Sequence, residues 1–120
     1  MELGTRYETI EEVVTMLESR LGIVMREHDD AETGVSFWWA SDLDAKNGVK
    51  YYAVDVRPTR SFDPEENEYV LGHRDWEGYT FVIGISDELT AEIAKIRELI
   101  AQGVLKAEEI PAPAAISPPP

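Results

Sequence analysis

The stretch that most constrains this chain is residues 34–57, in which two arms rich in aromatic and β-branched residues flank an Asn-Gly pair. Aromatic and β-branched residues favour strands, and Asn47-Gly48 suits the left-handed backbone of a tight hairpin turn. We therefore expect residues 34–57 to form the central hairpin of an antiparallel sheet. The hairpin contains two adjacent pairs of aromatic residues: Trp38 and Trp39 in the first arm, Tyr51 and Tyr52 in the second.

The two faces of this hairpin both carry aromatic side chains. Because successive strand residues point to opposite faces, Phe37 and Trp39 share one face and Trp38 lies on the other. We expect four side chains to point into the core: Phe37, Trp39, Tyr52 and Val54. Trp38 and Tyr51 then lie on the second face, where they are either covered by the same chain or exposed for a partner.

Composition describes a soluble, acidic, single domain. The chain has 120 residues, a formal net charge of −13 and no cysteine. The charge repels phosphate backbones and anionic membranes, so we expect neither direct nucleic-acid binding nor membrane binding. The missing cysteines exclude disulfides and thiolate metal sites, and the chain start lacks the pattern of a signal peptide. We expect a cytoplasmic location, or a virion if the chain is phage-derived.

Two amphipathic helices are predicted near the ends of the domain. Residues 9–21 carry apolar residues at helical spacing, and Thr9 with Glu12 forms a capping box. Gly22 suits a left-handed helix end. A second helix is expected to begin at a Ser86 or Asp87 cap and to end at Gly103, with the following residues folding back onto its last turn.

The remaining segments predict short strands and an extended tail. We expect a strand at 23–27, an irregular stretch at 58–67 that Phe62 pins to the body, and a second hairpin in which 68–74 pairs with 79–85. Residues 108–120 are rich in proline and alanine and favour polyproline II. The predicted fold is therefore α+β: a two-layer antiparallel meander of about five strands with an N-terminal and a C-terminal helix, in one domain over 1–107.

The sequence offers little catalytic equipment. His73 and Asp75 could pair for general base catalysis, but no nucleophile accompanies them. The acidic loop at 42–48 departs from a calcium loop, because a lysine replaces one ligand and the glycine is one place late. With only two histidines, a multi-histidine metal site is excluded. We therefore assign no catalytic, cofactor-binding or metal-binding residue and expect no cofactor.

Partner binding is the leading hypothesis. We expect a non-enzymatic interaction or assembly subunit, such as a component of a phage tail, that binds a basic protein or copies of itself through aromatic side chains and an extended C-terminal arm. The alternative is an acidic inhibitor or immunity-type protein that blocks a basic active site or nucleic-acid-binding cleft, and a small enzyme using His73 is a third reading. The predicted partner-binding residues are Trp38, Tyr51, Phe62, Glu65, Glu66 and Trp76.

Overall fold

A computed structural model describes residues 1–29, 36–40 and 53–111. The predicted turn at 47–48, Tyr51, Tyr52 and the acidic loop at 42–48 lie outside these described residues. Along the chain the elements are β1 (Glu2–Thr5), α1 (Ile10–Leu21), β2 (Met25–Asp29), β3 (Ser36–Ala40), β4 (Val54–Pro58), β5 (Arg60–Asp63), β6 (Glu68–Leu71), the 3₁₀ helix η1 (Arg74–Trp76), β7 (Phe81–Ile85), α3 (Thr90–Ala101) and β8 (Ala107–Ile110).

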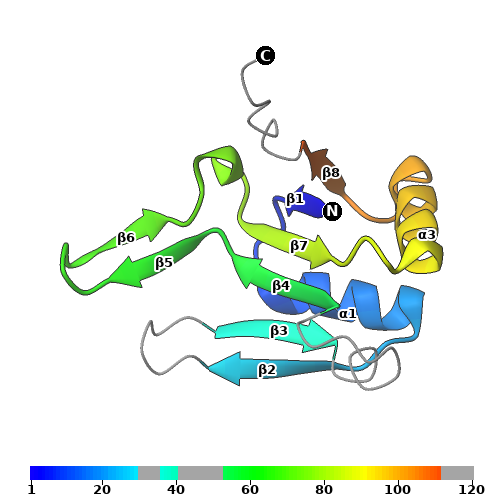
Figure 1. The fold of residues 1–120 in the computed structure, drawn as a ribbon, viewed down its shortest axis with the longest axis horizontal. Coiled ribbons are helices and arrows are strands. Elements are labelled where there is room, and N and C mark those ends of the chain that lie inside the picture. Colours follow the sequence, from blue (N-terminus) through cyan, green and yellow to red (C-terminus); the bar gives the residue numbers. More distant parts are fainter. Residues whose placement is uncertain (30–35, 41–52, 112–120) are drawn as a thin grey trace, which may run out of the picture.

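The structure is α+β, as predicted, with six of its strands in one antiparallel sheet (Figure 1). The strand order is β2-β3-β4-β7-β1-β8, while β5 and β6 form a separate two-stranded sheet. β7 lies in the middle of the large sheet, and its almost continuous apolar sequence is typical of such a strand. The predicted antiparallel sheet of about five strands has six, because β1 and β8 add two strands, while β5 pairs with β6 outside it.

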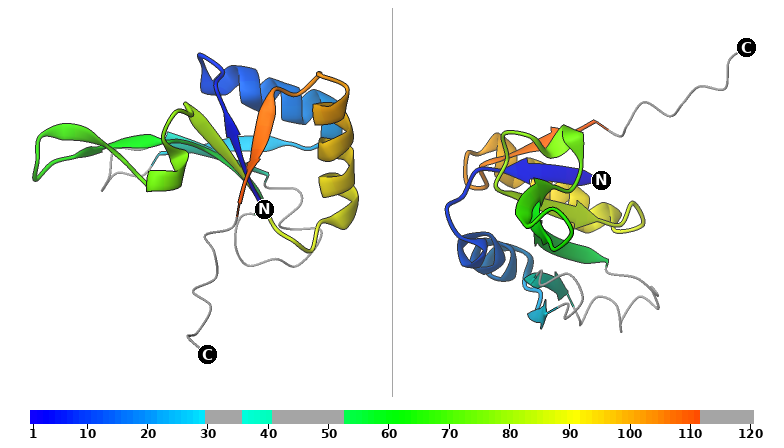
Figure 2. Two further views of the ribbon diagram at one scale, coloured as in Figure 1. Left: turned by 90° about the horizontal axis from the view of Figure 1, so that it is seen from above. Right: turned by 90° about the vertical axis from the view of Figure 1, so that its left-hand side faces the viewer.

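Both helices bury their apolar sides against the same face of the six-stranded sheet. Val54 and Val56 of β4 and Ile83 of β7 point to this face and are completely buried. They join one hydrophobic cluster with residues from each helix, including Leu17 of α1 and Ile96 of α3. The sheet and the two helices therefore enclose a single core (Figure 2).

Helix α1 begins and ends as the sequence predicts. The Thr9 hydroxyl accepts the Glu12 backbone N–H, and the Glu12 carboxylate accepts the Thr9 backbone N–H at 3.0 Å. These two bonds satisfy helix-start donors that would otherwise lack partners. At the other end Gly22 adopts a left-handed conformation with φ of 67°. The capping box and the glycine stop are both confirmed.

Helix α3 differs from the prediction at its start and agrees with it at its end. Leu89 is the capping residue and makes no side-chain cap, so the predicted Ser86 or Asp87 cap was wrong. Gly103 adopts a left-handed backbone with φ of 73°, and the Leu99 carbonyl accepts the N–H groups of Val104 and Leu105. Leu105 is 1% exposed. The chain therefore folds back onto the last turn as predicted.

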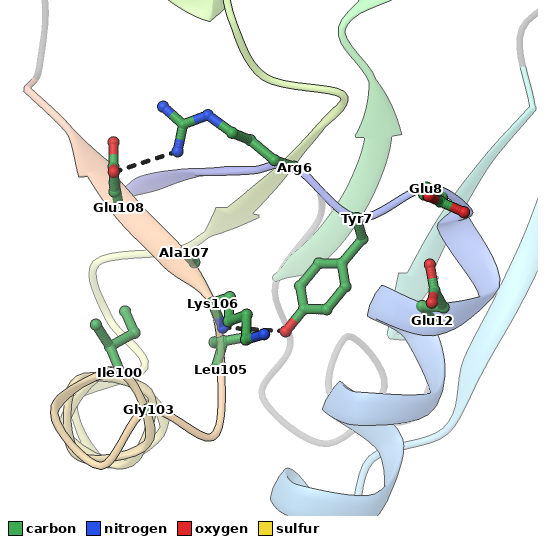
Figure 3. Close-up of a pocket in the computed structure, with 10 residues that line it drawn as sticks. All are labelled: Arg6, Tyr7, Glu8, Glu12, Ile100, Gly103, Leu105, Lys106, Ala107 and Glu108. Atoms are coloured by element: carbon green, nitrogen blue, oxygen red, sulfur yellow. Dashed lines mark hydrogen bonds and ion pairs between the residues drawn. The ribbon is translucent and has the colours of Figure 1, made fainter.

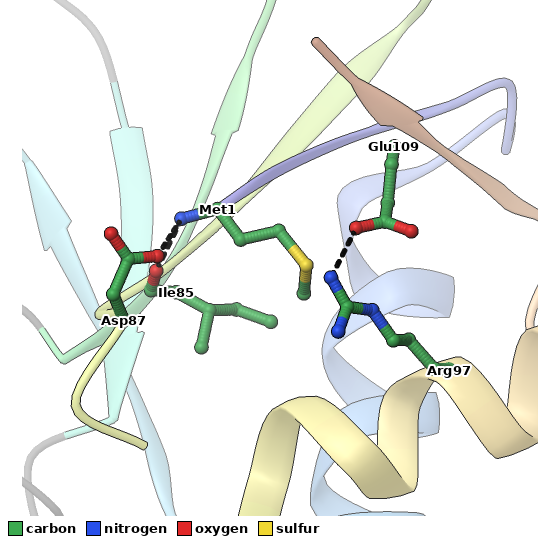
Figure 4. Close-up of polar contacts among 5 residues, drawn as sticks. All are labelled: Met1, Ile85, Asp87, Arg97 and Glu109. Atoms are coloured by element: carbon green, nitrogen blue, oxygen red, sulfur yellow. Dashed lines mark hydrogen bonds and ion pairs between the residues drawn. The ribbon is translucent and has the colours of Figure 1, made fainter. Parts of the chain in front are cut away.

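Residues at the two ends of the domain form strands that the sequence did not reveal. β1 pairs with β7 on one side and with β8 on the other. The N-terminal ammonium donates to the Ile85 carbonyl at 2.8 Å and pairs with Asp87, while Arg97 of α3 pairs with Glu109 of β8 (Figure 4). Residues 108–110 thus belong to the sheet, so the predicted tail starts too early.

The face assignment of β3 is the reverse of the prediction. Trp38 lies opposite Val56 in the antiparallel register and packs against the hydrophobic core. Phe37 lies on the other face, where its ring contacts His28 at a centroid distance of 5.1 Å and the Arg57 guanidinium at 5.2 Å. The Trp39 side chain is not among the described parts of the structure. Strand alternation was correct, but the choice of the inner face was wrong.

Candidate partner-binding arm

The segment from Arg60 to Leu71 forms a hairpin that projects from the six-stranded sheet on the side opposite α3 (Figures 1 and 2). We call these residues the arm. The structure corrects two predictions here: within the stretch expected to be irregular, residues 60–63 form strand β5, and β6 pairs with β5 rather than with β7. Within the described chain, β5 and β6 pair only with each other, so both outer edges of the arm lack a strand partner.

One face of the arm carries an exposed aromatic pair. Phe62 and Tyr69 lie directly opposite each other across the two strands, with ring centroids 5.5 Å apart in an edge-on arrangement. Tyr69 is 70% exposed and Phe62 is 37% exposed. Phe62 therefore packs within the arm, and the prediction that it pins this segment to the body was wrong. Aromatic side chains exposed to this degree are typical anchors of protein interfaces.

The outer end of the arm carries four carboxylates around its turn. Asp63 and Glu68 form the last cross-strand pair, and Glu65 and Glu66 lie in the exposed turn between them. The Asp63 carboxylate accepts the Glu65 backbone N–H at 2.9 Å. With Arg60 as its one basic residue, the arm has a formal charge of −3. Two like charges directly opposite each other destabilise a strand pair, and a cationic partner would relieve this cost.

The root of the arm is anchored by a buried threonine. Thr59 is 3% exposed, and its hydroxyl donates to the Tyr79 carbonyl at 2.8 Å. Its own carbonyl accepts the Gly72 N–H at 2.8 Å, which closes the base of the arm. The Trp76 ring packs over Gly72, where a Cβ atom would come within 2.8 Å of the ring. These contacts hold the arm at a defined place on the body.

The structure brings together three of the predicted partner-binding residues and separates the others. Phe62, Glu65 and Glu66 all lie on the arm. Trp76 is half-buried at the arm's root, and its indole N–H has no hydrogen-bond acceptor among the described residues. Trp38 packs on the core, and Tyr51 lies outside the described residues. Sequence reasoning missed Tyr69. It lies two residues before Leu71 and so shares one face of the strand with it, a pattern that could have identified it.

The His73–Asp75 pair has the geometry of a turn. His73 Nδ1 accepts the Asp75 backbone N–H at 3.2 Å and lies 3.4 Å from the Asp75 carboxylate. An Nδ1 atom that accepts cannot also donate to a carboxylate, as it must in a catalytic His–Asp pair. Both side chains are exposed, and the His73 side chain caps the start of η1. This geometry favours a structural role over general base catalysis.

A shallow groove lies between the start of α1, the end of α3 and the first half of β8 (Figure 3). We call it the β8 groove; its volume is about 840 Å³. Its residues are Arg6, Tyr7, Glu8, Glu12, Ile100, Gly103, Leu105, Lys106, Ala107 and Glu108. The Tyr7 hydroxyl accepts the Lys106 backbone N–H at 3.0 Å, so its ring is fixed as part of the wall.

One end of this groove contains a shared carboxylate. Glu108 accepts a hydrogen bond from the Tyr79 hydroxyl at 2.7 Å and another from Arg6 at 3.2 Å. These two donors, Tyr79 first, lower the pKa of Glu108, and the Glu108 hydrogen bond is the main cause of the raised pKa of Tyr79. The Arg6 guanidinium also lies 4.7 Å from the centre of the Tyr79 ring. The charges at this end are therefore mutually satisfied.

Two kinds of site are missing from the part of the chain that the structure describes. These residues contain no group of three or more histidine, cysteine, aspartate or glutamate side chains arranged to hold a metal ion. None of the described helices has the length and apolar character needed to cross a membrane.

Comparisons of the chain with protein-family models, with curated proteins and with solved structures find no match.

Proposed function

We propose that this chain is a non-enzymatic interaction protein whose arm binds a basic partner protein. The observation that supports this proposal most strongly is the exposed Phe62–Tyr69 pair on a projecting hairpin that ends in four carboxylates. Such a pair buries a large apolar area on binding at a small cost in side-chain entropy. The surrounding carboxylates attract cationic surfaces and speed the first encounter.

The chemistry of the arm defines the surface it would fit. The complementary site is an apolar pocket or slot for Tyr69 and Phe62, with lysine or arginine side chains placed to meet Glu65 and Glu66. The overall charge of −13 extends the attraction beyond the arm itself. A partner that is itself acidic or that lacks an apolar pocket does not fit this surface.

The experiment compares two charge reversals of equal size. Glu65→Lys with Glu66→Lys alters the arm, whereas Glu88→Lys with Glu98→Lys makes the same change in charge at exposed residues beside and on α3. Proteins captured from lysate by the native chain should be lost with the arm variant and retained with the α3 variant. Equal capture by both variants, or equal loss from both, would contradict a role for the arm.

The projecting shape of the arm also supports the second reading, an acidic inhibitor. A hairpin that extends beyond the body can enter a cleft, which a flat sheet face cannot do. If the captured partner is an enzyme or a nucleic-acid-binding protein, a molar excess of this chain should block its activity, and the block should weaken as salt is added. An active partner in the saturated complex would exclude inhibition and leave the assembly role.

A further inference from the structure

The β8 groove has the features of a binding site for an uncharged, extended peptide. Tyr7, Ile100, Leu105 and Ala107 contribute its apolar surface. Among its charged residues, Arg6 pairs with Glu108, and Glu12 accepts the Thr9 backbone N–H of the capping box. Three of the five charged side chains that line the groove are therefore engaged, and the other two, Glu8 and Lys106, are of opposite sign, so the lining favours an uncharged segment over a charged one.

The groove also continues along α1. A second hollow of about 520 Å³ shares Tyr7 and Glu12 with it and extends past Met16 to Arg20. We call these two neighbouring hollows the furrow; together they border most of α1, a 12-residue helix about 18 Å long. This length suits an extended segment of several residues better than a compact small molecule.

We propose that the β8 groove binds residues 112–120 of a second copy of this chain, so that copies associate by exchanging their C-terminal segments. These nine residues carry no charged side chain, and Ile116 is their one large apolar residue. Four of them are prolines, which lack the N–H needed to extend a sheet and favour polyproline II. In that conformation nine residues span about 28 Å, enough to follow the furrow along α1.

The exchange between copies follows from where the segment leaves the sheet. Residues 112–120 follow the Ile110 end of β8, whereas the groove is formed beside Leu105 to Glu108 at the other end. Pro111 and Pro113 make a tight reversal at this point unfavourable, because proline fixes its own φ and disfavours the helical region for the residue before it. To reach the groove of its own chain, the segment would have to turn back from Ile110 along β8 toward Leu105. A second copy can receive it without a reversal at 111–113.

The test measures the solution mass of the full chain by light scattering over a range of concentrations. We expect twice the 13.5 kDa of one chain at high concentration and dissociation on dilution. Ile116→Asp should raise the dissociation constant by about tenfold or more, because it removes a buried isoleucine side chain. Ser117→Asp adds the same charge one residue later and should change the constant by less than about threefold. A peptide of residues 111–120 should compete with the association.

Other results would overturn the proposal. If the native chain is a monomer at every concentration, exchange is excluded. This holds even if amide chemical shifts show that the segment binds the groove of its own chain. Equal effects of the two aspartate variants would mean that Ile116 is not the residue recognised. Chemical-shift differences between the native chain and Ile116→Asp that spare Tyr7, Leu105 and Ala107 would place the segment elsewhere. Charge reversal at Glu65 and Glu66 should leave the dimer intact, so this test is separate from that of the arm.

Discussion

The six-stranded sheet and the arm are built from the same kind of antiparallel pairing but differ in how their side chains are covered. In the sheet, Val54, Val56 and Ile83 are completely buried beneath α1 and α3. In the arm no residue from 60 to 72 is buried, and Tyr69 is 70% exposed. A two-stranded hairpin gains little stability by itself in water. The comparison indicates that the sheet maintains the fold, while the arm is available for binding.

The largest expected effect comes from removing a side chain from the covered face. Ile83→Ala should lower the free energy of unfolding by about 2–5 kcal/mol, because it leaves a cavity between the central strand and the helices. Tyr69→Ala removes a larger side chain from the arm and should change stability by only about 0.5 kcal/mol. Chemical denaturation of both variants measures the contrast. Similar losses in the two variants would show that the arm is part of the cooperative core.

A smaller loss of unfolding free energy is expected where the open face of the sheet is tightly packed. Gly4 of β1 lies under the Tyr79 ring, and a Cβ atom there would be 2.5 Å from the ring carbons. Gly4→Ala should therefore cost about 1–3 kcal/mol of unfolding free energy through overpacking. In a Tyr79→Ala background the same change should cost much less, since the obstructing ring is gone. An undiminished cost there would place the strain elsewhere.

The smallest expected effect is the pH dependence of stability that Glu108 causes. Its lowered pKa means that the folded chain releases this proton more readily than the unfolded chain. The resulting stabilisation is present above the pKa of the unfolded state and is lost as the pH falls through the folded pKa. Glu108→Gln should therefore be slightly less stable than the native chain at neutral pH, with the difference vanishing in acid. A difference that grows as the pH falls would contradict these hydrogen bonds.

The sequence predicts elements well where local chemistry defines them. Thr9 with Glu12 predicted the start of α1, and Gly22 and Gly103 marked the helix ends. These signals depend on neighbouring residues, so a single sequence contains them. They were sufficient for the α+β class.

Long-range pairing explains the errors. β1 has one large apolar residue, Leu3, and β8 lies next to proline-rich sequence, so neither resembles a strand until the two pair. β6, with Tyr69, resembles a core strand, yet its partner is the short, polar β5 rather than β7. The arm was missed for the same reason, because the prediction paired β6 with the wrong strand. Phe62, Glu65 and Glu66 were selected for their chemistry, but only the register between β5 and β6 shows that they group with Tyr69.

Replacing the arm tests the division between fold and binding most directly. Thr59 and Gly72 are joined by a hydrogen bond of 2.8 Å, so a two-residue Asn-Gly turn can substitute for residues 60–71 without opening the large sheet. We predict that this variant keeps its fold, with an unfolding free energy within about 1 kcal/mol of the native chain, and no longer captures the partner. Loss of the fold, or retained partner binding by a folded variant, would contradict the account.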